Sequence, residues 1–219
     1  PTNRLRREGT RNLLAAARAA GVERLLAQSI AFAYAPEGDW IKAEDARLGT
    51  DAPAPMDQAI GAVAELERQV LEAQGVVLRY GYFYGPGTQF DPQGFYGDMA
   101  RKRQFPIVGS GEGRWSFIHI EDAATATVAA LERGQPGVYN IVDDDPARVT
   151  DWAPAFAAWV GAKPPFRVPA WLARLVAGRP GVQIMTRQRG ASNAKAKQDL
   201  GWSPAHPSWR DGFGAAAAS

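Results

Sequence analysis

The segment from Val76 to Gly87 constrains the fold more than any other part of the chain. It begins with apolar residues that do not alternate with polar ones, which is typical of a strand buried on both faces of a parallel sheet. It continues into tyrosines set among glycines and a proline, so the chain must turn sharply where this strand ends. Ligands of open α/β sheets bind in the crevice beyond such strand ends. The tyrosines therefore indicate the wall of a pocket, although an aromatic strand end packed under a loop fits the same residues.

Helix-like and strand-like patterns alternate ahead of this segment. An alanine-rich stretch at 8–21 ends at a glycine and predicts a helix, and an apolar run at 24–30 predicts a strand. Residues 36–55 are rich in proline and glycine and are expected to be irregular, whereas the apolar stripe at 56–73 predicts a long helix. This alternation with short connections predicts an α/β fold with a parallel, doubly wound sheet.

Shorter elements are expected in the second half of the chain. Strands are predicted at 106–108, 115–120 and 138–142, and helices are predicted at 95–103, from Glu121 to Gly134, from a cap at Thr150 or Asp151 through Trp159, near 170–177 and at 192–200. The glycines at 109, 111 and 113 lack the G-x-G-x-x-G spacing and do not open a helix, so they are interpreted as a hairpin-like loop. The alanine run at 215–218 is expected to be a frayed end.

Composition narrows the functions that the chain can have. With 219 residues, 46% of them hydrophobic and 22% charged, it is expected to form one medium-sized globular domain or somewhat more. The net charge of +2 and the scattered basic residues give no indication of nucleic acid or of a membrane as partner. The absence of cysteine excludes disulfides and thiolate catalysis. Two histidines are too few for a histidine-rich centre, so no metal site is expected.

The termini and the hydropathy pattern suggest where the protein resides. No apolar run approaches the roughly 18 residues that a membrane-spanning helix needs, and no signal peptide is visible, so a cytoplasmic location is expected. The chain begins at Pro1 and leads directly into a helix-like pattern, which we interpret as a chain that starts inside a fold.

Five motifs follow one another in an order that one protein family shares. They are R-E-G-T-R-N-L-L at 7–14, Q-S at 28–29, L-R at 78–79 with Y-G-P-G at 84–87, F-I-H-I-E-D at 117–122 and L-G-W-S-P at 200–204. Together they make the chain similar to the extended short-chain dehydrogenase/reductases, also called the NAD-dependent epimerase/dehydratase family. The resemblance covers nearly the whole chain. It implies a partial Rossmann-like sheet, NAD or NADP as cofactor, and a small-molecule substrate.

The resemblance also implies a division of the chain and a missing part. Residues 1–85 and 114–145 would form the C-terminal part of a Rossmann-like NAD(P)-binding domain, and residues 86–113 and 146–219 a smaller substrate-binding subdomain. Members of the family begin with a strand, a glycine-rich turn and a helix that hold the cofactor pyrophosphate. No such segment is found here, so about 90 residues of the N-terminal half of the sheet are expected to be absent.

The proton-transfer residues of the family are replaced in this chain. The family uses a tyrosine, a lysine four residues later that lowers the tyrosine pKa, and a nearby serine or threonine. Aligning the helix at 56–73 on Glu67 places Ala59 at the tyrosine position and Val63 at the lysine position. Ile30 falls at the hydroxyl position, with Ser29 beside it. No shift of register restores the pair, because residues 51–75 contain neither tyrosine nor lysine.

Other residues remain candidates for the site. The resemblance implies cofactor contacts for Ser29, Tyr80 and Gly81, although Ser29 could instead bond to its own backbone. Tyr34 is a weak candidate for a replacement proton donor, because a tyrosine without a cationic neighbour keeps its pKa near about 10.

The substrate-facing candidates are Tyr82, Trp115 and His119. Trp115 stands where nucleotide-sugar enzymes of the family commonly carry an arginine, and Arg114 would point to the opposite face of the strand. This favours a flatter, less charged substrate than a nucleotide sugar. The histidine that matches His119 in the family is more often a structural hydrogen-bonding residue than a base.

Three hypotheses for function follow. The first is an NAD(P)-dependent oxidoreductase or epimerase-type enzyme that acts on a small molecule. The second is a non-catalytic NAD(P)-fold binding or sensor protein, which the loss of the tyrosine and lysine favours. The third is an inactive fragment whose strand 24–30 is an uncovered edge, which would make it poorly soluble or oligomeric. The family also commonly dimerises through helices that match 8–21 and 56–73, so a homodimer is a further expectation.

Overall fold

A three-stranded parallel sheet forms the centre of the computed structural model, which describes residues 1–213. The strand order is β1 (Leu26–Ile30), β3 (Val76–Tyr80) and β8 (Gly137–Ile141), and all pairings are parallel. The sheet confirms the predicted α/β architecture, and β1 lies at its edge as expected. The alanine run at 215–218 lies outside the described residues.

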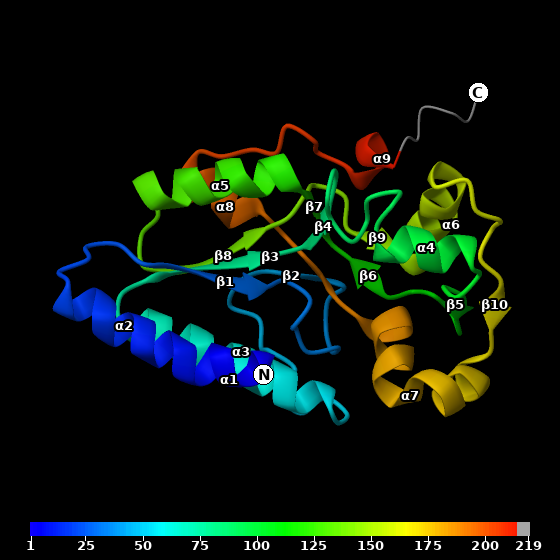
Figure 1. Cartoon of the computed structure of the whole chain (residues 1–219), viewed down its shortest axis with the longest axis horizontal. Helices are drawn as coiled ribbons and strands as arrows, with labels where there is room; N and C mark the ends of the chain where they lie inside the picture. Colours follow the sequence, from blue (N-terminus) through cyan, green and yellow to red (C-terminus); the bar gives the residue numbers. More distant parts are fainter. Residues whose placement is uncertain (214–219) are drawn as a thin grey trace.

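Helices cover both faces of this sheet (Figure 1). The helical segment α1 (Thr2–Arg4), η1 (Leu5–Gly9) and α2 (Thr10–Ala19) runs along α3 (Met56–Glu72) on one face, and η1 is a π-helix. The helices α5 (Ile120–Arg133) and α8 (Ala194–Leu200) pack on the other face, where alanines of α5 contact Leu78 and Ile141. The predicted helices at 8–21 and 56–73 are therefore present. The homodimer through them stays a prediction.

The buried segment divides at Gly81, where one continuous strand was expected. β3 ends at Tyr80, and β4 (Tyr82–Tyr84) leaves the three-stranded sheet to pair with β7 (Phe117–His119). The amide of Gly81 donates to the carbonyl of Ile141 (3.0 Å), whereas the amide of Tyr82 donates to the carbonyl of Ser116 (2.8 Å). The chain thus changes its hydrogen-bonding partner within one residue, and this opens the space beyond β3.

Most of the remaining elements, apart from the long helix at 170–187, are short, and most of them lie at the other end of the molecule (Figure 1). They are α4 (Phe95–Arg101), β5 (Ile107–Val108), β6 (Arg114–Trp115), β9 (Ala147–Arg148), α6 (Val149–Trp159), β10 (Arg167–Val168), α7 (Ala170–Arg187), β11 (Gly190–Ala191) and α9 (Trp209–Gly212). An aromatic core that includes Phe90, Trp152 and Phe156 holds them together.

Three predicted boundaries are wrong in instructive ways. Neither Thr150 nor Asp151 caps α6, because this helix begins at Val149 directly after strand β9. Helix α7 does not stop at 177: it continues to Arg187 past a break at Gly178, whose φ of 66° is not helical. The predicted strand at 115–120 is two strands, and Ile120 already belongs to α5.

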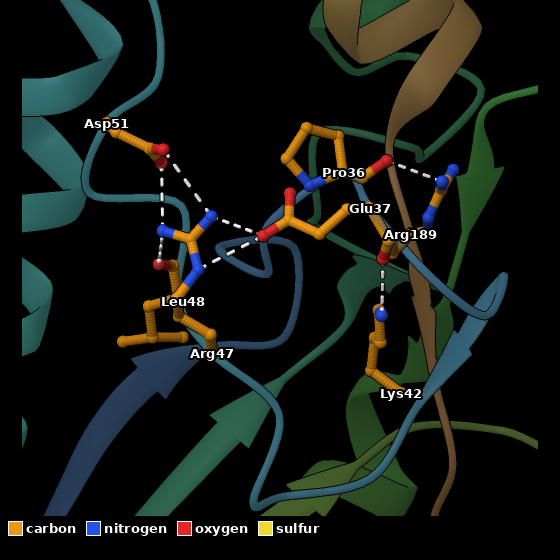
Figure 2. Close-up of polar contacts among 7 residues, drawn as sticks. All are labelled: Pro36, Glu37, Lys42, Arg47, Leu48, Asp51 and Arg189. Carbon is orange, nitrogen blue, oxygen red and sulfur yellow. Dashed lines mark hydrogen bonds and ion pairs between the residues drawn. The ribbon is translucent and has the colours of Figure 1, made fainter.

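The segment 36–55 is irregular, as expected, and its only strand is the two-residue β2 (Ile41–Lys42). Side-chain contacts hold it in place. Figure 2 shows Arg47 between the carboxylates of Glu37 and Asp51, to both of which it is paired. Arg189 donates to the carbonyl of Pro36 and so ties the start of the segment to the C-terminal part of the chain. Within the described residues, no helix is both long and apolar enough to cross a membrane.

We expect Gly81→Ala to destabilise the protein, because an added methyl group would lie 2.6 Å from the carbonyl oxygen of Ser116 and 3.0 Å from the backbone of Phe117. Overpacking of this kind costs about 1–3 kcal/mol of the free energy of unfolding, which urea titration measures. In the control Gly9→Ala, the methyl group would meet Leu5 at 3.8 Å, an ordinary contact. Equal stability of the two variants would contradict the prediction.

The stability of the protein is expected to depend on pH through Asp143, which follows β8 and is 1% exposed. Burial raises the pKa of this carboxyl well above its ordinary value of 3.8. The folded state therefore holds the proton more tightly than the unfolded chain, so the free energy of unfolding falls as the pH rises through and above that value. We expect Asp143→Asn to flatten this part of the stability–pH curve, measured by thermal unfolding between about pH 4 and 7. A variant with the same slope as the parent would argue against the assignment.

Candidate functional site

A cavity of about 660 Å³ opens where β1 and β3 end. One side is formed by Ser29 and Ile30 from β1 and by Tyr80 and Gly81 from the end of β3. The opposite side comes from the loop 87–90 that follows β4. This is the edge at which parallel sheets bind their ligands. The structure thus brings together all three predicted cofactor contacts, Ser29, Tyr80 and Gly81, with the predicted substrate contact Tyr82.

Aromatic side chains are six of the fourteen described residues that line the cavity. The rings of Phe32 and Tyr82 are stacked, with centroids 4.3 Å apart and planes inclined by 11°. Behind Tyr82 lies Trp115, stacked at 4.1 Å and 19°. Trp115 is 3% exposed and belongs to the aromatic core, so it supports Tyr82 and does not line the cavity itself. Its position in the sequence gave no indication of this supporting contact.

The cavity wall is uncharged and contains no strong nucleophile. Among the described residues that line it, none is Asp, Glu, Lys, Arg, His or Cys. Its tyrosines are Tyr80, Tyr82 and Tyr96, and burial raises the pKa of each hydroxyl above its ordinary value. The hydroxyl of Tyr80 is hydrogen-bonded to Thr127 (2.5 Å), and that of Tyr82 donates to Gln188 (3.0 Å). These side chains are therefore neutral phenols near neutral pH.

A buried polar network lies behind the cavity and fixes Ser29. The Ser29 hydroxyl donates to Glu67 Oε1 at 2.5 Å, not to its own backbone. Arg79 donates to both carboxylate oxygens of Glu67, at 2.9 and 2.7 Å, and all three side chains are buried. The register explains the grouping, since Ser29, Arg79 and Asn140 lie in one row across the sheet. Because the Ser29 hydroxyl already donates its hydrogen to Glu67, it can only accept hydrogen bonds from a ligand.

Tyr34 belongs to this network and does not line the cavity. Its hydroxyl donates to Asn140 Oδ1 (2.7 Å) and accepts from Arg79 (2.8 Å). The premise that Tyr34 has no cationic neighbour was therefore wrong, because Arg79 is invisible in the local sequence. Burial nevertheless outweighs Arg79 and raises the Tyr34 pKa. A buried, weakly acidic hydroxyl outside the cavity is poorly placed for the proton transfer considered for it.

His119 also lies outside the cavity, at the start of α5. Its ring stacks on His206 at 3.8 Å, and its Nδ1 accepts from the amide of Glu121 (3.4 Å) as the helix cap. Asp122 accepts from the amide and the ring of His206 (2.9 and 3.2 Å). The atoms of His119, Glu121 and His206 that could bind a metal lie within 4.8 Å of one another. The number of histidines in the sequence did not indicate this proximity. Glu121 is mostly exposed, and the absence of a metal site stays a prediction.

Helix α3 carries Ala59 and Val63, the residues that the resemblance places at the tyrosine and lysine positions. Val63 is 1% exposed and, with Ser29 and Ile30, lines a smaller cavity of about 210 Å³ beside the end of β1. The glycine cluster lies elsewhere, where a side chain added at Gly109 would meet Ala170 and one added at Gly111 would meet Thr150. As the sequence spacing indicated, this cluster does not open a helix; it connects β5 to β6, but it is not a hairpin, because β5 pairs with β10 and β6 with β9.

The comparisons with known proteins agree with this architecture. A model of the NAD dependent epimerase/dehydratase family matches residues 2–142. The chain is 48% identical over 216 residues to a 3-diazoavenalumate denitrifying reductase of a Streptomyces species, covering 97% of this chain and 71% of that protein. The chain belongs to the NAD dependent epimerase/dehydratase family. With a 2-alkyl-3-oxoalkanoate reductase of Stenotrophomonas maltophilia it shares 30% identity over 169 residues, which is 70% of this chain and 50% of that protein.

Solved structures of the family share the fold. The dTDP-glucose 4,6-dehydratase of Streptomyces venezuelae with NAD bound matches with a TM-score of 0.76 at 18% identity, covering 96% of this chain and 64% of that one. A UDP-glucose 4-epimerase of Thermotoga maritima matches with a TM-score of 0.73 at 23% identity, covering 96% and 67%. Together with the reductase relatives, family membership supports an oxidoreductase-type function. The chain spans between half and about seven-tenths of the length of these relatives.

The ion pair behind the cavity gives a testable consequence. Glu67→Gln would leave the Arg79 charge buried without its partner, and we expect a loss of about 3–5 kcal/mol in the free energy of unfolding. The double variant Glu67→Leu with Arg79→Met removes both charges and should recover most of that loss. Chemical unfolding of both variants measures the difference.

The matched control is Glu72→Gln on the same helix, because Glu72 pairs with Arg68 on the exposed surface. Its free energy of unfolding should remain nearly unchanged. Glu67→Gln at parent-like stability would show that the buried pair does not hold this part of the fold together.

Proposed function

We propose that the protein is an NAD(P)H-dependent reductase that delivers hydride to an aryl diazonium ion and so replaces its dinitrogen group by hydrogen. The observation that carries this proposal is the uncharged cavity with aromatic side chains at the ends of β1 and β3. It is joined by the expected replacement of the proton-transfer pair by Ala59 and Val63 on α3, where Val63 lines the small cavity that shares Ser29 and Ile30 with the large one. The 48% identity to a 3-diazoavenalumate denitrifying reductase supports the choice of substrate class.

The chemistry of this reaction explains why the pair is dispensable. When hydride attacks the ring carbon of Ar–N₂⁺, the hydride electron pair forms the C–H bond. The C–N bond breaks and its electron pair leaves with N₂, so the products are Ar–H and N₂. No proton is taken up or released. Reduction of a carbonyl group differs, because the alkoxide that forms must be protonated by an acid such as the family's tyrosine.

The cavity suits a planar, cationic and electrophilic aromatic substrate. The ring of Phe32 lines the cavity and stacks on Tyr82, whose other face is covered by Trp115, so Phe32 is the ring that offers a π surface to a cation. Diazonium ions react with thiolates, amines, imidazoles and phenolates, and the described wall contains no Cys, Lys or His. Its three tyrosines are held neutral by burial, as phenols and not as reactive phenolates.

The residues present fit one end of the cofactor. Ser29, Tyr80 and Gly81 would hold the nicotinamide at the strand ends, where the Ser29 lone pairs can accept from its amide group. Bound NAD(P)H supplies the hydride. No described residue forms a glycine-rich phosphate loop of the family's kind, so the binding of the pyrophosphate and the choice between NAD and NADP are left open.

The second candidate function is cofactor or ligand binding without turnover, as in a sensor. The same replacement of tyrosine and lysine favours it, because a scaffold that has lost catalysis would lose these residues first. In that case Tyr82, with Trp115 behind it, would still bind a flat ligand.

Turnover in heavy water tests the proposal directly. The longest protein that the reading frame encodes is incubated with 3-diazoavenalumate and NAD(P)H deuterated at the transferred position in ordinary water, and separately with unlabelled NAD(P)H in heavy water. We expect release of N₂, deuterium in the arene product, and a solvent isotope effect on kcat/KM close to 1, since no proton moves in the reaction. Tyr82→Ala, which removes the ring on which Phe32 stacks, should raise KM by about tenfold or more, whereas Tyr82→Phe should retain activity.

Two results would overturn the proposal. Binding of NAD(P)H without hydride transfer to any aryl diazonium would favour the sensor. A large solvent isotope effect combined with turnover of a ketone would point to a carbonyl reductase with a different proton donor.

A further inference from the structure

The small cavity beside Val63 is lined by one positively charged side chain, that of Arg6, to which the proposed function assigns no role. Arg6 lines this space of about 210 Å³ together with Ser29, Ile30 and Val63. Ser29 and Ile30 also line the large cavity, so the two spaces share the end of β1. Arg6 therefore lies at the rim of the same site, on the side formed by the first helical segment.

Arg6 is positioned by an unusual backbone. It lies in η1, the π-helical turn Leu5–Gly9 between α1 and α2. Single π turns are rare within helices and frequently occur at functional sites. Here the turn places Arg6 opposite Val63 and Leu66 of α3, whose aliphatic side chains offer no partner to its guanidinium.

The charge of Arg6 serves no visible structural purpose. Within the described residues its side chain makes no hydrogen bond and no ion pair, although it is only partly exposed. The nearby Arg4 differs, since it pairs with Glu8 at 2.8 Å on the surface. A guanidinium carries five donors and keeps its charge at any physiological pH, so it is suited to binding and not to proton transfer.

The expected loss of a lysine at Val63 and the presence of an arginine at position 6 complement each other. In the resemblance drawn above, the lysine position is Val63 and the family's asparagine before Gly-Thr falls at Leu5 or Arg6. The chain has thus lost a cation on α3 and carries one on η1 that lines the same small cavity. The positive charge that the family carries on the helix matching α3 is thus replaced by the charge of Arg6 on η1, at the same small cavity.

We propose that Arg6 is a cofactor-binding residue that donates hydrogen bonds to the ribose and phosphate oxygens at the nicotinamide end of NAD(P)H. This inference rests on the proposed use of NAD(P)H. It assigns to Arg6 the binding part of the missing lysine's role, and not its effect on a tyrosine pKa, because Ala59 leaves no tyrosine to activate.

The test measures cofactor affinity without turnover, in the longest chain that the reading frame encodes. NADH and NADPH are titrated by fluorescence against the parent and against Arg6→Gln, Arg6→Lys and Arg4→Gln. We expect Kd to rise about tenfold or more in Arg6→Gln, to rise by less in Arg6→Lys, and to stay unchanged in Arg4→Gln. Val63→Lys added to Arg6→Gln should restore part of the affinity.

Shorter probes identify the oxygens involved. If Arg6 contacts the ribose, reduced nicotinamide riboside should lose affinity in Arg6→Gln as NADPH does. If it contacts the phosphate, only reduced nicotinamide mononucleotide and the full cofactors should lose affinity. Either pattern supports the proposal.

Equal Kd values for the parent and Arg6→Gln, at equal thermal stability, would overturn the assignment of Arg6. This outcome differs from failure of the proposed function, in which the parent binds NAD(P)H and Arg6→Gln weakens that binding, yet no diazonium is reduced. A parent protein that binds neither NADH nor NADPH would overturn both.

Discussion

The buried ion pair between Glu67 and Arg79 is the interaction on which the rest of the site depends. Glu67 lies on α3 and Arg79 on β3, so the pair joins a helix to the central strand in the protein interior. A charge in this position would be costly alone, and the two charges are compensated by two hydrogen bonds that Arg79 donates to Glu67. The same groups hold Ser29 and Tyr34, so one network sets the positions of the strand end and of the loop that follows it.

This network also separates charge from the ligand cavity. The ionised side chains lie behind β1 and β3, whereas the cavity in front is lined by neutral phenols, amides and hydrocarbon rings. Burial keeps the tyrosine hydroxyls protonated, and the stack of Phe32, Tyr82 and Trp115 keeps the wall flat. The described cavity wall therefore contains neither a charged base nor a strong nucleophile, which suits the flat cation of the proposed function.

Much of the architecture could be predicted from the sequence because its signals are local. The apolar run at 76–80, the stripe of α3 and the ordered motifs each identify their element without reference to distant residues. The absence of tyrosine and lysine from residues 51–75 follows from residue identity alone, whereas the assignment of their positions to Ala59 and Val63 stays a prediction. The features of the site that escaped prediction depend on contacts between distant segments: Arg79 beside Tyr34, Trp115 behind Tyr82, and His206 on His119. The division of the strand at Gly81 belongs with them, since β7 and β8 impose it.

The loss of the tyrosine and lysine has two physical readings, and the surroundings of Val63 favour one of them. If the site had merely decayed, nothing would require a cation to remain near the end of β1. Instead the small cavity beside Val63 is lined by Arg6, on a π-helical turn and free of partners among the described residues. An arginine cannot donate its proton at physiological pH, but it can bind oxygen atoms. A site that needs a bound hydride donor and no acid would retain this arrangement, because it separates cofactor binding from proton transfer.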